Sequence, residues 1–132
     1  MSGKPILIVD DNALNLKLAR TLLAAAGHEV RTAGDAGEAL EVLQAFRPVL
    51  ILMDIQLPGM DGLTLTRQLK ADPATRDIVV VALTSYAMKG DDEKALASGC
   101  AGYITKPLDT RSFVEEVALF ARGNAGGEDP PP

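Results

Sequence analysis

The sequence predicts an α/β domain built on a parallel β-sheet, and three observations support this. Three continuously apolar runs, Ile6–Val9, Val49–Met53 and Ile78–Leu83, are too short for helices and do not alternate between apolar and polar residues. Such runs are typical of central strands covered on both faces. Segments with helical period separate the runs, so strand and helix alternate, as in parallel sheets with right-handed crossovers. The length of 132 residues is enough for one such domain and too short for two.

The first predicted helix follows the first strand. Leu14, Leu18 and Leu22 fall four residues apart, which is the spacing of a helix face, with Ala19, Leu23 and Ala26 beside them. Gly27 supplies a C-terminal stop. The next segment, Glu29–Ala33, has a weaker apolar character. It suits a more peripheral strand.

The second and third predicted helices flank the second apolar run. Asp35 followed by Glu38 resembles a capping box, which predicts a helix that ends before Pro48. A third helix is expected near Leu63–Lys70, because the helix-breaking pair Asp72-Pro73 follows it.

The last third of the chain contains two more helices and one strand. Asp91–Ser98 reads as a helix that stops at a glycine, and Gly102–Thr105 suits a peripheral strand. The final helix is expected to begin at Asp109 or Thr110 and to bury Phe113, Val117 and Phe120 before it ends at Gly123. We therefore expect one domain over residues 1–122 and a disordered Gly- and Pro-rich tail over residues 123–132.

Composition excludes several classes of protein. The formal net charge is −5, and 13 scattered basic residues are outnumbered by 18 acidic ones, so we expect no nucleic-acid binding. Cys100 is the only cysteine, which excludes an internal disulfide. Met1–Pro5 give no signal-peptide pattern, and the longest apolar run, of six residues, is far too short to cross a membrane. These observations predict a soluble, cytoplasmic protein without a membrane anchor.

Polar residues stand at the carboxyl ends of four predicted strands. Asp10 and Asp11 follow the first strand, Asp54 the third, Thr84 the fourth and Lys106 the fifth. Ligands of open parallel sheets bind outside the carboxyl ends of the strands. We therefore expect three carboxylates, a hydroxyl and an ammonium group to converge at one edge.

This set of groups fits phosphoryl chemistry with a divalent cation. Clustered carboxylates repel one another unless a cation is present, and hard oxygen ligands suit Mg²⁺. An aspartate can act as a nucleophile toward phosphorus and form an aspartyl-phosphate. Each residue also has an ordinary interpretation: Asp11 as a helix cap, Asp54 as a loop acid, Lys106 as a surface lysine. All of these together would be an improbable coincidence.

In these motifs the chain resembles the receiver domains of bacterial two-component response regulators, and in particular their single-domain members. The resemblance extends from about Lys4 to Arg122. It rests on four segments in the same order and at the same spacings: Ile6–Asn12, Leu52–Gly62, Ala82–Ser85 and Gly102–Pro107. It implies a flavodoxin-like, doubly wound (βα)5 sandwich with strand order 2-1-3-4-5 and helices on both faces.

The resemblance also implies roles for individual residues. Asp54 would be the phosphorylated residue. Asp11, Asp54 and the backbone carbonyl of Gln56 would bind Mg²⁺ directly, and Asp10 would act mainly through metal-bound water. Thr84 and Lys106 would bind the phosphoryl group.

Coupling to the surface is implied in the same way. Thr84 and Tyr103 would form the switch pair, and Pro107 would follow a cis peptide bond after Lys106. The phosphoryl donor would be a histidine kinase or a histidine phosphotransfer protein. A downstream protein would bind through the surface formed by Asp91–Ala121. The chain would signal rather than act as an enzyme, apart from Mg²⁺-dependent self-phosphorylation and slow self-dephosphorylation.

Three alternatives have different sequence requirements. A phosphatase of the haloacid dehalogenase class usually has a second aspartate two residues after the nucleophile, where this chain has Gln56. A nucleotide- or flavin-binding module would need a Gly-rich loop after the first strand, where Asp10–Ala13 stand. The third alternative, a receiver taken from a longer hybrid protein, stays open, although the initial Met and the polar tail favour a complete chain.

Overall fold

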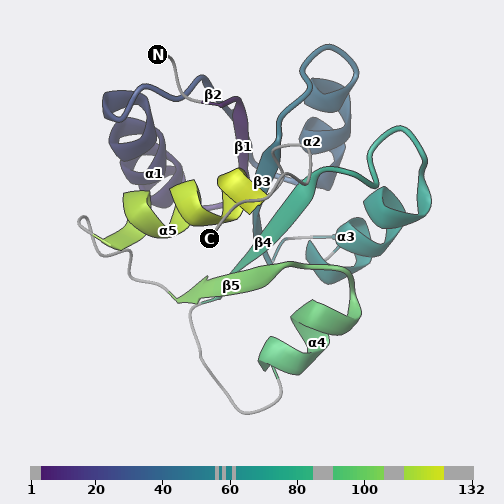
Figure 1. Ribbon diagram of the computed structural model, residues 1–132. Coiled ribbons are helices and arrows are strands. Elements are labelled where there is room, and N and C mark those ends of the chain that lie inside the picture. Colours follow the sequence, from purple (N-terminus) through teal and green to yellow (C-terminus); the bar gives the residue numbers. More distant parts are fainter. Residues whose placement is uncertain are drawn as a thin grey trace.

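A computed structural model describes residues 4–55, 57, 59–60, 62–84, 91–105 and 112–123. In these residues strands and helices alternate along the chain, and the strands form one parallel sheet in the order β2-β1-β3-β4-β5 (Figure 1). The predicted α/β class and strand order are therefore confirmed. The elements are β1 (Ile6–Val9), α1 (Ala13–Ala25), β2 (Val30–Ala33), α2 (Ala36–Leu43), β3 (Leu50–Asp54), α3 (Gly62–Ala71), β4 (Val79–Thr84), α4 (Asp91–Ala97), β5 (Gly102–Thr105) and α5 (Ser112–Gly123).

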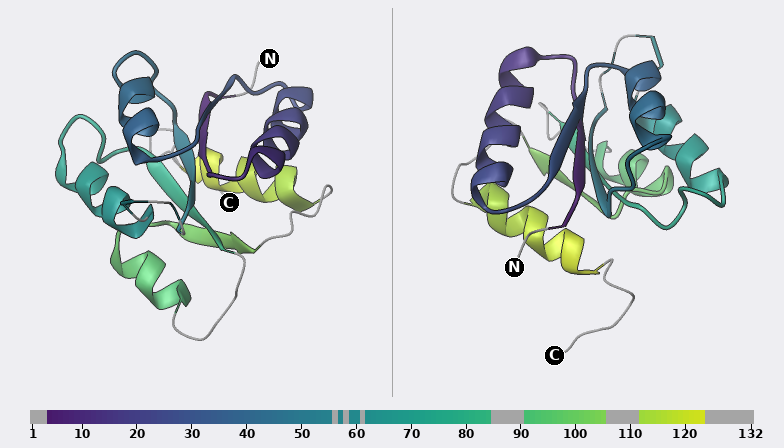
Figure 2. Two further views of the ribbon diagram at one scale, coloured as in Figure 1. Left: turned by 180° about the vertical axis from the view of Figure 1, so that it is seen from behind. Right: turned by 90° about the horizontal axis from the view of Figure 1, so that it is seen from above.

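Helices cover both faces of the sheet, as Figure 2 shows most clearly in the view from above. α1 and α5 pack on one face, where a core forms around Leu23, Leu52 and Phe113. α2, α3 and α4 pack on the other face, where a second core forms around Met53 and Leu65. Every residue of β1 is inaccessible to solvent, because this strand is central and covered on both sides. This explains why its sequence is apolar without alternation.

The leucine spacing predicted α1 correctly but did not identify its buried face. Leu14 is 77% exposed and Leu18 is 37% exposed. The side of α1 that faces the sheet is centred on Ala19 and Leu23, which stand beside the spaced leucines in the sequence, with Leu16 and Leu22 partly buried. Leucines occur on more than one side of this helix, so their period alone could not show which side contacts the core.

Two central strands extend one residue beyond their predicted ends. β3 includes Asp54 and β4 includes Thr84, and Asp54 pairs in register with Leu83. The ladder continues past Asp54, because the amide of Ile55 donates to the carbonyl of Leu83 at 3.2 Å. The two polar residues are therefore held by the sheet rather than by a loop.

The predicted helix ends are confirmed in the described residues. Gly27 and Gly99 adopt positive φ angles of 98° and 110° after α1 and α4, which permits a left-handed C-terminal turn. Asp35 caps α2 by accepting from the amide of Glu38 at 2.8 Å, while the Glu38 side chain accepts from the amide of Gly34 at 2.6 Å. The Asp35 half of the predicted capping box is therefore confirmed, whereas Glu38 accepts from the amide one residue before the N-cap rather than from the amide of Asp35.

The last helix buries the residues expected of it. Phe113 and Val117 are almost inaccessible, and Phe120 is partly buried against the β5 backbone at Gly102. The predicted start at Asp109 or Thr110 and the predicted tail after Gly123 lie outside the described residues. Among the helices that the structure describes, none has the length and apolar character needed to span a bilayer.

Candidate metal and phosphoryl site

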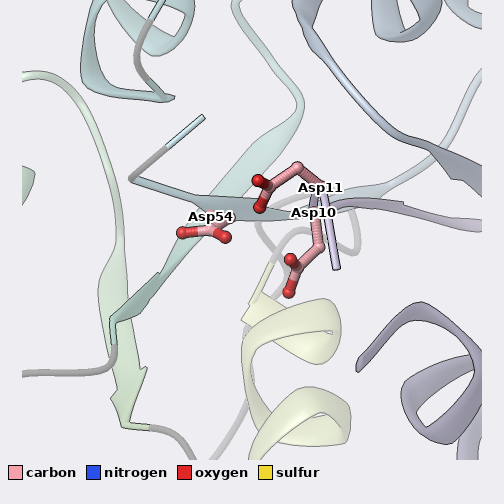
Figure 3. Close-up of side chains that lie close together, drawn as sticks. All are labelled: Asp10, Asp11 and Asp54. Atoms are coloured by element: carbon pink, nitrogen blue, oxygen red, sulfur yellow. The ribbon is translucent and has the colours of Figure 1, made fainter. Parts of the chain in front are cut away.

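Three carboxylates meet at the carboxyl ends of the neighbouring strands β1 and β3. Asp10 and Asp11 follow β1, and Asp54 ends β3, which is the neighbour of β1 in the sheet. One oxygen from each carboxylate lies within 4.8 Å of the others (Figure 3). Asp10 and Asp54 are buried and Asp11 is exposed. The predicted convergence of residues that lie 44 positions apart is therefore confirmed for this part of the site.

The loop between β1 and α1 fixes the first two aspartates. The Oδ1 atom of Asp10 accepts from the backbone amide of Asn12 at 2.9 Å. Asn12 is the N-cap of α1, and its Oδ1 accepts from the amides of Leu14 and Asn15 at 2.9 and 3.1 Å. Asp11 therefore does not act as the helix cap, and its carboxylate can lie with the other two.

The capping role of Asn12 is the feature of this loop that the sequence analysis did not predict. Asparagine is among the strongest N-cap residues, so its position one residue before the helical segment was the available signal.

The geometry of the cluster fits a divalent cation with oxygen ligands. Carboxylates whose oxygens lie within 4.8 Å of one another repel unless positive charge offsets them. Mg²⁺ prefers carboxylate oxygens and retains several water molecules, so a site with one exposed side suits it. The residues present therefore fit Mg²⁺.

Thr84 and Tyr103 lie on neighbouring strands with side chains on the same face of the sheet. Tyr103 pairs in register with Ala82, and Thr84 is two residues further along β4. Side chains two residues apart in a strand point the same way, and in-register partners share a face. Thr84 is buried at the edge that carries the carboxylates, whereas Tyr103 is 42% exposed. Gln56, Lys106 and Pro107 lie outside the described residues.

Two other reactive side chains lie at the opposite edge of the sheet. Cys100 precedes β5 and is buried, and burial raises the pKa of its thiol. Its Sγ atom lies 4.0 Å from the hydroxyl of Thr66. Burial also lowers the pKa of Lys70, which donates to the carbonyls of Arg76 and Ile78. These groups contribute to packing around the α3–β4 connection.

Known proteins resemble this chain over most of its length. A family model that describes the response regulator receiver domain matches residues 6–118. The polar-differentiation response regulators DivK of Brucella anthropi and Brucella ovis are 46% identical to it over 117 residues, which cover 89% of this chain and 95% of the relative.

Solved structures agree with this match. A CheY-like response regulator receiver domain protein from Methanospirillum hungatei has a TM-score of 0.86 and 30% identity, and the match covers 96% of this chain and 100% of that one. The receiver domain of the sensor histidine kinase PA1611 from Pseudomonas aeruginosa has a TM-score of 0.82 and 30% identity, covering 92% and 99%. Its crystal structure has a magnesium ion coordinated in the active site cleft.

The family model, the relatives and the fold therefore lead to one assignment. Receiver domains interact with histidine kinases and phosphotransfer proteins, are phosphorylated on aspartate and bind Mg²⁺ at an acidic pocket, and the cluster of Asp10, Asp11 and Asp54 fits that pocket. The chain belongs to the response regulator receiver domain family and is a signalling domain of two-component systems.

Proposed function

We propose that Asp54 accepts a phosphoryl group from a phosphohistidine on a histidine kinase or a histidine phosphotransfer protein. The observation that carries this proposal is the position of Asp54, which is a buried carboxylate at the end of the central strand β3. It lies beside two further carboxylates that can bind a cation. Receiver domains in general have such partners, and our proposal assigns the acceptor to this residue.

The transfer is a displacement at phosphorus. A carboxylate oxygen of Asp54 forms the new O–P bond while the P–N bond to the donor imidazole breaks, and the bonding electron pair leaves with that nitrogen. Because β3 pairs with β1 as far as Met53 and with β4 as far as Asp54, the sheet limits the movement of the Asp54 backbone during the displacement. This fixed geometry lowers the entropic cost of reaching the reactive arrangement.

The metal ligands in this proposal are Asp11, Asp54 and the backbone carbonyl of Gln56, with Asp10 acting through metal-bound water. When bound, Mg²⁺ supplies positive charge to the oxygens of the transferring group. Asp10 is held by the Asn12 amide, so its carboxylate has a fixed orientation toward the other two. Asp11 is exposed and completes the cluster from the solvent side.

Thr84 and Lys106 bind the phosphoryl oxygens in this proposal, and Thr84 couples them to Tyr103. The Thr84 hydroxyl donates to a phosphoryl oxygen, and Tyr103, which is exposed in this structure, moves inward on the same face of the sheet. This movement changes the surface formed by Asp91–Ala121, where a downstream protein binds. A phosphoryl group biases such a two-state element through its local charge.

Intact mass spectrometry with a small-molecule phosphodonor tests the acceptor. In Mg²⁺ the wild type should gain the mass of one phosphoryl group, and this gain should be absent in EDTA and in Asp54→Asn. Asp77→Asn, which removes an exposed carboxylate at the other edge of the sheet, should be phosphorylated like the wild type. Phosphorylation of Asp54→Asn at the wild-type rate would disprove the assignment.

A further inference from the structure

The first residue of α3 has no room for a side chain. A Cβ atom built on Gly62 would collide with the backbone oxygen of Asp54 and would lie 2.9 Å from the Asp54 carbonyl carbon and from the Cα atom of Ile55. All three atoms belong to the backbone, so none can rotate away from the added group. The α3 terminus and the last peptide of β3 are therefore in direct contact.

α3 cannot easily move away from this contact. Leu65 is inaccessible and Leu69 is 3% exposed, so the core holds the helix through its apolar side. Thr66 is also fully buried, and its hydroxyl donates to the carbonyl of Gly62 at 2.8 Å. This hydrogen bond ties the first turn of α3 to the anchored part of the helix.

The backbone at Asp54 and Ile55 is held less firmly than the rest of β3, because the pairing with β1 ends at Met53. The amide of Ile55 donates to the carbonyl of Leu83 at 3.2 Å, and the carbonyl of Ile55 accepts from the amide of Gly62 at 3.3 Å. The first distance is at the upper end of the usual range and the second is just beyond it. A displacement forced by a side chain at position 62 would therefore be taken up at the end of β3.

We propose that Gly62 is a positioning residue that sets where the carboxylate of Asp54 stands. The backbone that Gly62 contacts carries this carboxylate, so a shift of the backbone moves it relative to Asp10 and Asp11. The inference rests on the proposed function, in which Asp54 binds Mg²⁺. Changes to groups that orient metal ligands typically weaken metal binding about 10- to 100-fold.

The first experiment compares alanine substitutions at two helix glycines. Gly62→Ala should bind Mg²⁺ at least about tenfold more weakly than the wild type in a calorimetric titration. In Gly37→Ala the new Cβ would lie 3.5 Å from Oδ1 of Asp35, which is ordinary contact, so this control should bind Mg²⁺ like the wild type. Without Mg²⁺, the Ile55 amide resonance should shift in Gly62→Ala and not in Gly37→Ala.

A second substitution separates positioning from simple packing. Thr66→Val removes the hydroxyl but keeps the shape, and so loosens the first turn of α3 while its backbone hydrogen bonds remain. By itself it should weaken Mg²⁺ binding, because the turn holds the end of β3 less firmly. In the Gly62→Ala background it should instead restore part of the lost affinity, because the loosened turn can shift away from Asp54.

A different result is expected if Gly62 and Thr66 serve only the packing of α3. Gly62→Ala and Thr66→Val would then lower the stability toward urea, while the Mg²⁺ affinity of each folded variant would equal that of the wild type. That result would overturn the inference, as would an unshifted Ile55 amide in Gly62→Ala. If Gly62→Ala does not fold, Thr66→Val alone decides, and unchanged Mg²⁺ affinity in this variant would contradict the proposal.

The two proposals fail in different ways. If the wild type binds no Mg²⁺, or if Asp54→Asn is phosphorylated like the wild type, the proposed function is wrong and the inference falls with it. If the wild type binds Mg²⁺ and is phosphorylated on Asp54 but Gly62→Ala behaves identically, only the inference is wrong.

Discussion

Replacing Asp11 with asparagine should stabilise the metal-free protein. Asp11 is exposed and its carboxylate lies near those of Asp10 and Asp54, with one oxygen of each within 4.8 Å of the others. Asparagine has nearly the same shape without the charge. Since Asn12 caps α1, the substitution leaves the helix cap intact. The variant therefore removes charge repulsion and little else.

The magnitude follows from the separation of the charges. Two unit charges 4.8 Å apart repel by about 0.9 kcal/mol in a dielectric of about 80. Asp11 faces two such neighbours, but Asp10 is adjacent to it in the unfolded chain as well, so part of the repulsion persists there. Solvent and salt also screen an exposed charge. We expect Asp11→Asn to raise the free energy of unfolding by about 1 kcal/mol in EDTA at low salt.

In Mg²⁺ the wild type, rather than Asp11→Asn, should be the more stable protein. At a hundred times its dissociation constant, a ligand stabilises the folded state by about 2.7 kcal/mol. If the loss of Asp11 weakens Mg²⁺ binding on the order of a hundredfold, the same Mg²⁺ concentration stabilises the folded variant by only about 0.4 kcal/mol. The wild type should then be more stable than Asp11→Asn by about 1 kcal/mol. Urea unfolding in EDTA and in Mg²⁺ at matched ionic strength measures both differences.

A control for general charge effects is Glu41→Gln, which removes one negative charge from an exposed position on α2. It should change stability little and respond to Mg²⁺ like the wild type. In EDTA the difference in free energy of unfolding between Asp11→Asn and the wild type should decrease as NaCl is added, because salt screens the repulsion between the carboxylates. Charge repulsion at Asp11 is disproved if Asp11→Asn is no more stable than the wild type in EDTA. Its role in Mg²⁺ binding is disproved if Mg²⁺ stabilises both proteins equally.

Three further predictions concern other parts of the molecule. Thr84→Ala should leave Asp54 phosphorylatable but reduce the amide chemical-shift changes that beryllofluoride, a phosphoryl mimic, causes in Asp91–Ala121. The reason is that one hydrogen bond to a charged group contributes about 1.5–3 kcal/mol. Shift changes near Tyr103 as large as those of the wild type would mean that the switch uses another route. Asn12→Ala should lower the free energy of unfolding by about 1 kcal/mol in urea, because two amides of α1 lose their acceptor; unchanged stability would show that the cap contributes nothing. The Cys100 thiol is buried and its pKa is raised, so iodoacetamide should alkylate it slowly near pH 8 in the folded protein and much faster in the protein unfolded by urea. Equal alkylation rates in the folded and unfolded protein would contradict the burial.

The fold class, the chain order of the elements and the meeting of the three carboxylates were all predictable from the sequence alone. Central strands of a parallel sheet are buried on both faces, so Ile6–Val9 had to be apolar throughout, and that signal is local. Glycine stops and the capping box are local signals as well, which is why Gly27, Gly99 and Asp35 were placed correctly. The convergence of the carboxylates also followed from the sequence, because all parallel strands end at the same edge.

The side of each element that faces inward, and the backbone contacts between elements, depend on how the elements pack together. The leucine spacing of α1 could not reveal that Leu14 is exposed, since burial depends on where the sheet lies. The ends of β3 and β4 depend on hydrogen bonds to neighbouring strands, so the inclusion of Asp54 and Thr84 was not visible in either segment alone. The requirement for glycine at position 62 comes from a strand end that meets a helix start across a loop, a contact that exists only in the folded chain.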